Sequence, residues 1–506
     1  MAAVQNWKRY LVAILPVALC AAALLLSTSA GSNWNQFRGP NGSGVAQAEG
    51  LPLQFGPDQN VIWAVSVPSG HSSPVLDGER IFLTAVEEGQ LWTLCLERGN
   101  GQVLWRRQAP RQRHEKLDSR NNPASPSPAL DAAGNVYVFF ADFGLLSYTN
   151  QGEERWRLPM GPFDNSYGMG ASPVLAEDKV LLVCDQQTGS YLIAVGKEDG
   201  KVAWKVDRPE AKSGHSTPIV YKPSSGASQL LVPGSFQLNA YDVQSGKKVW
   251  WVNGLSFEMK STPVMGDGMV FVNGYATPLN QPDRMIQIAP FEEVLAKSDK
   301  DGDGKLSKQE SPDNLTKNFF DFLDLNKDGF LDQGDWQYFR AAMATKNGML
   351  GIRLGGQGDM SETNLVWQYH KSVPQLPSPL LYRGVLYMIN DGGIATSFEP
   401  ATGKEIARGR IRGAIDKYYA SPVAGDGKIF LLSETCKAAV LGTDGSLEVL
   451  AVNDLGSSCY ATPAIDQGRI YIRTQDKLYA FGKRKESGIR RGGETAEFAE
   501  RRRGGR

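Results

Sequence analysis

Residues 240–250 read Ala-Tyr-Asp-Val-Gln-Ser-Gly-Lys-Lys-Val-Trp, and this glycine turn followed by a tryptophan recurs along the chain. Four glycines each lie four residues before a tryptophan: Gly101 and Trp105, Gly152 and Trp156, Gly200 and Trp204, Gly246 and Trp250. Glycine supplies the positive φ that a tight turn needs. We expect the tryptophan at this fixed distance to pack into the next repeat each time.

A small residue and a proline open each repeat, ahead of β-branched and aromatic segments that are typical of strands. The prolines are Pro74, Pro128, Pro173, Pro218, Pro263, Pro379, Pro422 and Pro463. A period of roughly 40–50 residues with about four strands predicts a β-propeller, and eight openings predict eight blades. The step from Pro263 to Pro379 is more than twice as long as the others, which indicates an insertion in blade five.

The two ends of the repeat region complement each other. The last repeat runs through residues 478–481 without a tryptophan strand, whereas residues 61–65 form a tryptophan strand with no blade before it. We therefore predict that residues 61–65 complete blade eight, which removes the free sheet edges. The alternative is an open or stacked β array.

The repeat resembles that of pyrroloquinoline-quinone-like propellers, a superfamily that includes quinoprotein alcohol dehydrogenases and the propeller lipoprotein of outer-membrane assembly. The opening Trp34-Asn35-Gln36-Phe37-Arg38-Gly39-Pro40 is similar to the start of exported bacterial members. The resemblance covers roughly residues 34–482, apart from the insert, and implies an all-β eight-bladed propeller. Blades six and seven depart from the pattern, with Ala407 and no tryptophan in their outer strands.

The two ends of the chain differ in composition from the repeat region. Residues 1–30 combine Lys8 and Arg9, an apolar run and a small-residue stretch, which predicts a signal peptide and an exported, periplasmic or extracellular protein. The alternative is an uncleaved segment that tethers the protein to a membrane. We assign residues 31–282 to the closing strand, blades one to four and the first part of blade five. Residues 283–346 form the insert, and residues 347–482 form the rest of blade five and blades six to eight. Residues 483–506 have the composition of a disordered basic tail.

The net charge bears on the class of binding partner, and the positions of the cysteines bear on disulfide formation. The 506 residues carry a formal net charge of zero, so nucleic acid is not expected as a partner. Cys436 and Cys459 fall in neighbouring repeats and are the best candidates for a disulfide, which an exported chain permits. Cys95 and Cys184 lie in apolar strands, where we expect buried thiols.

Residues 299–310 of the insert match an EF-hand calcium loop, with a glycine at position 6 and oxygens at positions 1, 3, 5, 9 and 12. Calcium takes six to eight oxygen ligands. The predicted ligands are Asp299, Asp301, Asp303, the Lys305 carbonyl, Ser307 and Glu310.

Residues 324–335 repeat the same pattern. The predicted ligands are Asp324, Asn326, Asp328, the Phe330 carbonyl, Asp332 and Asp335. Asp335 is one carbon shorter than glutamate at position 12, so we expect weaker binding here. Two matches predict an α-helical EF-hand pair whose loops couple at Leu306 and Leu331. The sequence leaves open whether the calcium is structural or regulatory.

The residues three positions before the opening prolines are expected to ring the channel mouth. They are His71, Ser125, Gly170, His215, Lys260, Leu376, Tyr419 and Tyr460, with Glu258, Asp416 and Lys417 nearby. The insert falls between the second and third strands of blade five, on the same face. This arrangement predicts a pocket for a small molecule or a peptide. The alternative is turn chemistry, in which these side chains bond only to loop backbone.

Two functions compete for this architecture. No nucleophile, carboxylate pair or metal-hydrolase motif is recognisable, which favours a calcium-binding scaffold of the cell envelope that binds a ligand or protein and is not an enzyme. The alternative is a quinoprotein dehydrogenase that uses pyrroloquinoline quinone and calcium. The chain lacks the adjacent cysteine pair of those dehydrogenases and a CxxCH haem motif, and no residue could be assigned to quinone binding or catalysis.

Overall fold

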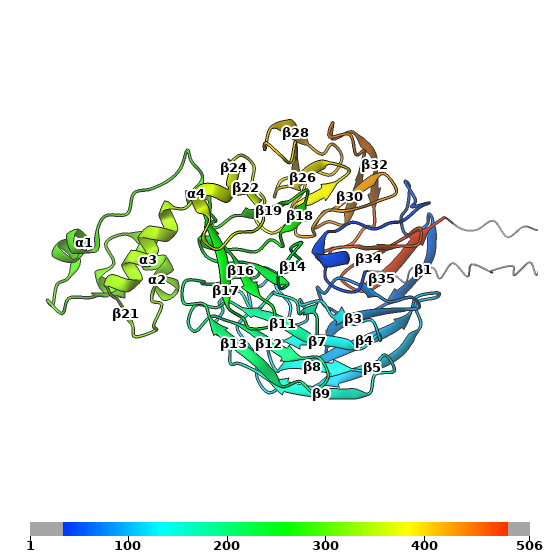
Figure 1. Ribbon diagram of the computed structural model, residues 1–506, viewed down its shortest axis with the longest axis horizontal. Coiled ribbons are helices and arrows are strands. Elements are labelled where there is room, and N and C mark those ends of the chain that lie inside the picture. The colour runs from blue at the N-terminus through cyan, green and yellow to red at the C-terminus, as the bar shows by residue number, and fades with distance from the viewer. Residues whose placement is uncertain (1–33, 484–506) are drawn as a thin grey trace, which may run out of the picture. The chain divides into compact units, whose positions relative to one another are not determined.

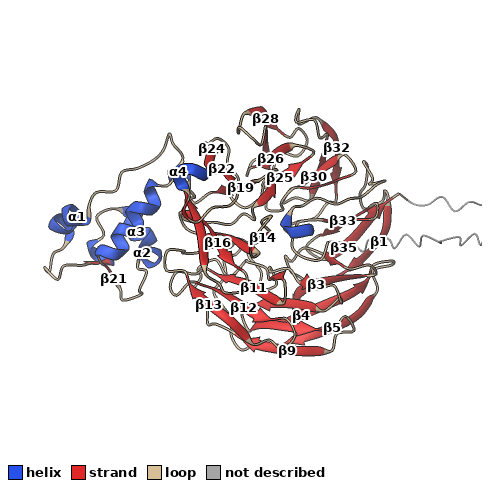
Figure 2. Cartoon of the chain, in the orientation of Figure 1, coloured by secondary structure: helices blue, strands red, loops and turns tan. Residues whose placement is uncertain are grey.

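The computed structural model describes residues 34–483. In these residues the strands form eight sheets of four or five strands around a channel, together with one two-stranded sheet (Figures 1 and 2). The prediction of an eight-bladed propeller is confirmed. The predicted signal peptide and nearly all of the predicted basic tail lie outside the described residues. No helix between residues 34 and 483 is long and apolar enough to cross a membrane.

Blades one to four follow each other along the chain, with the innermost strand first. Blade one holds β2 (Val75–Leu76), β3 (Arg80–Glu87), β4 (Gln90–Glu97) and β5 (Val103–Ala109). Blade two holds β6 (Ala129–Leu130), β7 (Val136–Phe140), β8 (Gly144–Tyr148) and β9 (Glu154–Pro159). Blade three holds β10 (Val174–Ala176), β11 (Lys179–Cys184), β12 (Tyr191–Gly196) and β13 (Val202–Asp207). Blade four holds β14 (Ile219–Tyr221), β15 (Gln229–Pro233), β16 (Gln237–Asp242) and β17 (Lys248–Asn253), with the added parallel strand β23 (Gly358–Asp359).

Blades five to eight complete the ring. Blade five holds β18 (Val264–Gly266), β19 (Met269–Gly274), β22 (Gly348–Arg353) and β24 (Leu365–Tyr369). Blade six holds β25 (Leu380–Tyr382), β26 (Val385–Ile389), β27 (Ile394–Phe398) and β28 (Glu405–Arg410). Blade seven holds β29 (Val423–Gly425), β30 (Lys428–Leu432), β31 (Lys437–Leu441) and β32 (Val449–Asp454). Blade eight holds β33 (Ala464–Asp466), β34 (Arg469–Arg473), β35 (Lys477–Gly482) and, as its outermost strand, β1 (Val61–Ser66).

The ring closes where the sequence predicted. Strand β1 pairs antiparallel with β35, with Ala64 opposite Tyr479. The buried Arg473 of blade eight then donates to the Ser72 hydroxyl at 2.7 Å and to the Thr84 carbonyl at 2.9 Å in blade one. Blade eight is therefore built from both ends of the propeller and bonded directly to blade one.

Each outer-strand tryptophan reaches the next blade, as predicted, with one exception. The Trp105 indole N–H donates to the Asn150 carbonyl at 3.0 Å, and its ring covers Gly152 of blade two. Trp63, Trp156, Trp204 and Trp367 make the corresponding bond to the turn of the following blade. Trp250 instead donates to Gln229 of its own blade at 2.8 Å. The turn it would have met in blade five is replaced by β23 and helix α4 (Ser361–Asn364).

The insert lies between β19 and β22 of blade five. It holds η2 (Pro278–Asn280), α1 (Phe291–Ser298), β20 (Leu306–Ser307), η3 (Lys308–Glu310), α2 (Asn314–Leu323), β21 (Phe330–Leu331) and α3 (Gln333–Ala344). Strands β20 and β21 pair antiparallel through Leu306 and Leu331, which are both fully buried. The apolar faces of the helices pack around this pair.

The cysteines divide as the sequence indicated. Cys436, from the turn between β30 and β31 of blade seven, forms a disulfide with Cys459, which precedes the innermost strand of blade eight. Cys95 and Cys184 are buried free thiols, and burial raises the pKa of Cys95 to about 12. These two thiols pack as small apolar side chains on β4 and β11.

We predict that Gly152→Ala lowers the free energy of unfolding by about 2–4 kcal/mol. Gly152 has a φ of +83°, and a Cβ there would lie 2.7 Å from the Trp105 ring. Gly89→Ala is the matched control, because Gly89 has a φ of +75° with no atom within 4 Å of the added Cβ. It should cost only about 1–2 kcal/mol, the conformational part. Equal losses in denaturant unfolding of the two variants would show that the tryptophan contact contributes nothing.

Candidate functional site

A ring of hydroxyl groups surrounds the channel at the start of the innermost strands. Each opening proline is preceded by serine or threonine: Ser73, Ser127, Ser172, Thr217, Thr262, Ser378, Ser421 and Thr462. At six junctions the backbone N–H of one of these residues donates to the hydroxyl of the next blade, at 2.9–3.0 Å. The hydroxyl oxygens act as acceptors here, so their own protons remain free to donate.

The N-terminal segment, drawn in dark blue beside β34 in Figure 1, spans the channel and bonds blades on different sides of it. The Asn35 backbone bonds Leu130 of blade two, and the Asn41 side chain bonds the Val220 backbone of blade four at 2.8 Å. The buried Arg38 donates to the Pro379 carbonyl of blade six at 2.7 Å. The segment that resembles the start of exported propellers therefore closes the floor of the channel, with η1 (Pro40–Gly42) at its end.

A cavity of about 300 Å³ lies above the floor, at the mouth of the channel. All eight residues placed three positions before the prolines line it, and Glu258 does so too. Phe37 of the floor segment and five of the ring hydroxyls line its base. Asp416 does not line the cavity, because its carboxylate accepts from the Thr435 backbone N–H at 2.9 Å. The repeat thus brings equivalent positions of all blades to a single site.

Several residues that line the cavity lie outside the repeat-equivalent positions, namely Asp118, Arg120, Asn121, Tyr167, Gln375 and Phe37. Asp118, Arg120 and Asn121 come from the loop between β5 and β6, which makes the step from Pro74 to Pro128 the longest of the regular steps. The extra length of this step is the feature of the sequence that could have predicted a loop long enough to reach the mouth.

Charged side chains at the mouth occur as two internally neutralised pairs. The Arg120 guanidinium holds both Asp118 carboxylate oxygens, at 2.7 and 3.1 Å, and these bonds keep the pKa of Asp118 below its usual value. The Lys260 ammonium lies 2.6 Å from the Glu258 carboxylate, and both side chains are less than a tenth exposed. The cavity therefore carries positive and negative groups without a net excess of either.

An aromatic wall occupies the side formed by blades one, seven and eight. The His71 ring stacks on Tyr460 with centroids 4.3 Å apart, and Tyr419 stacks on Tyr460 at 5.5 Å. The Tyr460 hydroxyl donates to Glu434 at 3.3 Å. Across the mouth, Tyr167 meets His215 edge-on at 6.1 Å.

Both mouth histidines are held neutral. Desolvation, with Arg473 assisting, lowers the pKa of His71 to about 4, and desolvation lowers the pKa of His215 to about 4. Each imidazole is therefore uncharged at neutral pH. The Nε2 atom of His215 is buried without a hydrogen-bond partner in the described chain.

The two loops of the insert repeat one bonding scheme. The carboxylate at position 1 accepts from the N–H of the position-6 glycine, at 3.1 Å for Asp299 with Gly304 and 2.9 Å for Asp324 with Gly329. The carboxylate at position 12 accepts from the N–H groups of positions 2 and 9 in both loops. Asp335 makes these bonds in spite of its shorter side chain.

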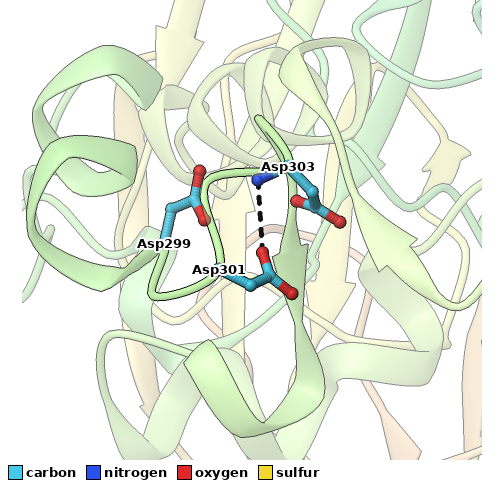
Figure 3. A group of neighbouring side chains, drawn as sticks. All are labelled: Asp299, Asp301 and Asp303. Carbon is cyan, nitrogen blue, oxygen red and sulfur yellow. Dashed lines mark hydrogen bonds between the residues drawn. The ribbon is translucent and has the colours of Figure 1, made fainter.

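Three carboxylates of the first loop converge closely enough to hold a metal ion (Figure 3). They belong to Asp299, Asp301 and Asp303, and the Asp303 N–H donates to Asp301 at 3.2 Å. The pKa of Asp301 is nonetheless raised, because desolvation and the neighbouring carboxylates outweigh that bond. A cation would relieve this repulsion. The Lys305 ammonium of the first loop lies 2.9 Å from the Asp328 carboxylate of the second loop.

Comparison with known proteins identifies the family of the chain. Residues 55–190, 94–250 and 188–316 match the family described as outer membrane protein assembly factor BamB, and together they span just over half of the chain. A search of curated proteins found no match.

Solved structures with the same fold include BamB and two dehydrogenases. BamB from Moraxella catarrhalis is 11% identical, with a TM-score of 0.50 over 83% of this chain and 98% of its own. A europium-containing methanol dehydrogenase is 10% identical, with a TM-score of 0.57 over 90% and 98%. The quinohemoprotein alcohol dehydrogenase ADHIIG from Pseudomonas putida HK5 is 11% identical, with a TM-score of 0.54 over 89% and 80%. Such low identities establish a shared fold alone.

We predict that stability falls as the pH drops from about 6.5 to about 4. In this range the unfolded chain protonates His71 and His215 while the folded protein does not, because both folded pKa values are lowered. Each histidine contributes up to about 3 kcal/mol to this loss. His71→Gln and His215→Gln should each flatten the dependence of the melting temperature on pH, whereas His114→Gln, at an exposed position, should not. Parallel profiles for all variants would contradict the assignment.

Proposed function

Because the chain belongs to the family described as outer membrane protein assembly factor BamB, we propose that it is an exported, calcium-binding propeller of the cell envelope that binds a ligand at the channel mouth. The sequence supports export through its first 30 residues. The observation that carries the binding role is the convergence of all eight repeat-equivalent positions on one cavity. The same face bears the EF-hand insert, so ligand and calcium sites belong to one functional surface.

The lining chemistry selects an uncharged, hydroxyl-rich ligand such as a sugar residue. The ring hydroxyls offer O–H donors from below, and the two ion pairs offer donors and acceptors from the sides. The wall of His71, Tyr419 and Tyr460 gives an apolar surface for the face of a ring. A charged ligand would have to break an existing ion pair, which costs more than it returns when no free partner charge is present.

The dehydrogenase alternative fits these residues poorly. Pyrroloquinoline quinone carries three carboxylates, and its binding would require cations that are free to neutralise them. Arg120 and Lys260, which line the cavity, are already paired with Asp118 and Glu258. Within residues 34–483 the free cysteines, Cys95 and Cys184, lie on separate blades and form no adjacent pair. We therefore derive no redox step at this mouth.

The mouth proposal is tested by ligand-observed NMR with methyl glucoside, methyl galactoside, methyl mannoside and N-acetylglucosamine, with glucuronate as a charged comparison. We expect at least one neutral sugar to bind and glucuronate to bind more weakly. Tyr460→Ala should abolish binding, while Tyr460→Phe, which keeps the stacked ring, should retain most of it. Stoichiometric binding of pyrroloquinoline quinone in calorimetry, or no binding of any neutral sugar, would overturn the proposal.

Calorimetric titration with calcium tests the insert. We expect two sites with dissociation constants of about 10⁻⁴ to 10⁻³ M, the range common for extracellular modules. Glu310→Gln should remove the first site and Asp335→Asn the second. Lys305→Gln should tighten the second, because it frees Asp328 while leaving the position-7 carbonyl in place. Asp283→Asn, an exposed acidic residue outside both loops, is the control. If all of these variants bound calcium with the same stoichiometry and affinity as the unchanged protein, the assignment of the two loops would be wrong.

A further inference from the structure

The insert is fixed to the propeller at the rim of the mouth cavity by aromatic contacts. Tyr338 of α3 meets Phe236 edge-on at 5.5 Å, and Phe322 of α2 lies 6.4 Å from Phe257. Phe257 is buried in the apolar core of the insert, although it belongs to the loop that leads into blade five. The next residue, Glu258, lines the mouth.

A hydrogen-bond chain runs alongside these rings. The Tyr338 hydroxyl donates to Ser235 Oγ at 3.3 Å, and Ser235 donates to the Phe257 carbonyl at 2.6 Å. Ser235 also accepts from the Lys212 backbone N–H at 2.8 Å. Phe236, next to Ser235, has a φ of +69°, a conformation that costs a non-glycine residue about 1–2 kcal/mol. The Phe236 N–H donates to the Ser256 carbonyl at 3.1 Å and its carbonyl accepts from the Gly254 N–H at 3.0 Å, so the propeller holds this backbone while the ring meets Tyr338.

The far end of α3 holds the opposite side of the same part of the mouth. The buried Asn280 donates to the Ala342 carbonyl at 2.8 Å and to the Thr345 carbonyl at 2.7 Å. The buried Asn347 side chain accepts from the Ala276 N–H at 2.9 Å. Ala276 lines the mouth and also belongs to the apolar core of the insert.

These two sets of contacts meet at the Lys260 ion pair. The Lys260 ammonium donates to the Tyr275 carbonyl at 3.0 Å and to Glu258 at 2.6 Å. Tyr275 precedes Ala276, and Glu258 follows Phe257. Both partners of Lys260 are therefore carried on segments that pack against the insert.

The second calcium loop joins the two helices that make these contacts. Asp324 caps the end of α2, two residues after Phe322, and Asp335 lies in the first turn of α3, three residues before Tyr338. A cation held by both carboxylates would clamp the end of α2 to the start of α3. It would thereby fix the spacing of the two aromatic rings that reach the propeller.

We propose that the EF-hand pair is a calcium-dependent brace for the mouth, in which an ion in the second loop fixes Phe322 and Tyr338 and so positions Glu258, Lys260 and Ala276. This inference rests on the proposed function of the insert and the mouth. It assigns the calcium a regulatory role, because ion binding would set the shape of one quadrant of the ligand site. It also singles out Tyr338 and Asn347 as positioning residues that never touch the ligand.

Hydrogen–deuterium exchange of the full chain, with and without saturating calcium, tests the brace. We expect calcium to slow exchange several-fold in residues 257–262 and 274–280, and to leave the equivalent mouth segment of blade one, residues 70–76, unchanged. Asp335→Asn should abolish the protection at the mouth. Tyr338→Phe should weaken it, because the ring stays and the bond to Ser235 is lost. Tyr369→Phe is the control, because the Tyr369 hydroxyl donates to Glu405 on β28, away from the insert.

Calorimetry on the same samples separates the two levels of the proposal. Calcium binding accompanied by protection confined to residues 291–344 would overturn the brace and leave the calcium sites standing. No calcium binding by either loop would overturn both. Protection at 257–262 and 274–280 that survives Tyr369→Phe but is reduced by Tyr338→Phe is the result that the brace requires.

Discussion

The hydrogen bonds between backbone N–H groups and hydroxyls around the channel connect the innermost strands of the propeller. An innermost strand has one edge without a partner strand, and buried backbone donors on that edge need acceptors. The opening proline has no N–H, so only the residue before it has to be satisfied. The hydroxyl of the following blade provides this acceptor, as Ser127 does for Ser73 at 2.9 Å. The same side chain thus satisfies one blade and links it to the next.

The outer tryptophans add a hydrogen bond to the next blade at five junctions, and together with the inner ring they limit sliding between neighbouring blades. The residues three positions before the prolines accordingly meet at one cavity. The repeat therefore determines where the mouth cavity lies. It does not determine which side chains line the cavity, because repeat-equivalent positions carry residues as different as His71, Gly170 and Lys260. One propeller architecture can therefore carry different sites, because function depends on the residues at these positions and not on the fold.

The sequence predicted the repeat and the place of the insertion, and it missed contacts at the mouth and floor made by segments that follow no periodic pattern. Blade number, the closing strand and most tryptophan contacts follow from periodic signals, and the structure agrees with them. Arg120 reaches the mouth from an irregular loop, and Arg38 holds the floor from a segment without repeat partners. Neither position is fixed by a periodic pattern, because each depends on a long-range contact that only the closed ring creates. Asp416 was near the mouth in sequence, but a bond to Thr435 holds it outside the cavity.

Blade five shows how the propeller accommodates an insertion without losing its ring. The insert opens the connection between β19 and β22, yet those strands still pair across six residues, from Met269 with Arg353 to Gly274 with Gly348. The next connection is rebuilt as well, since β23 pairs with β17 and the Ser361 hydroxyl accepts from the Asn253 backbone N–H at 2.9 Å. Blade four is therefore bonded to blade five by a strand and a short helix where a tryptophan would otherwise serve. The contact between blades four and five is therefore specific to this junction, and it keeps the ring joined next to the blade that carries the insert.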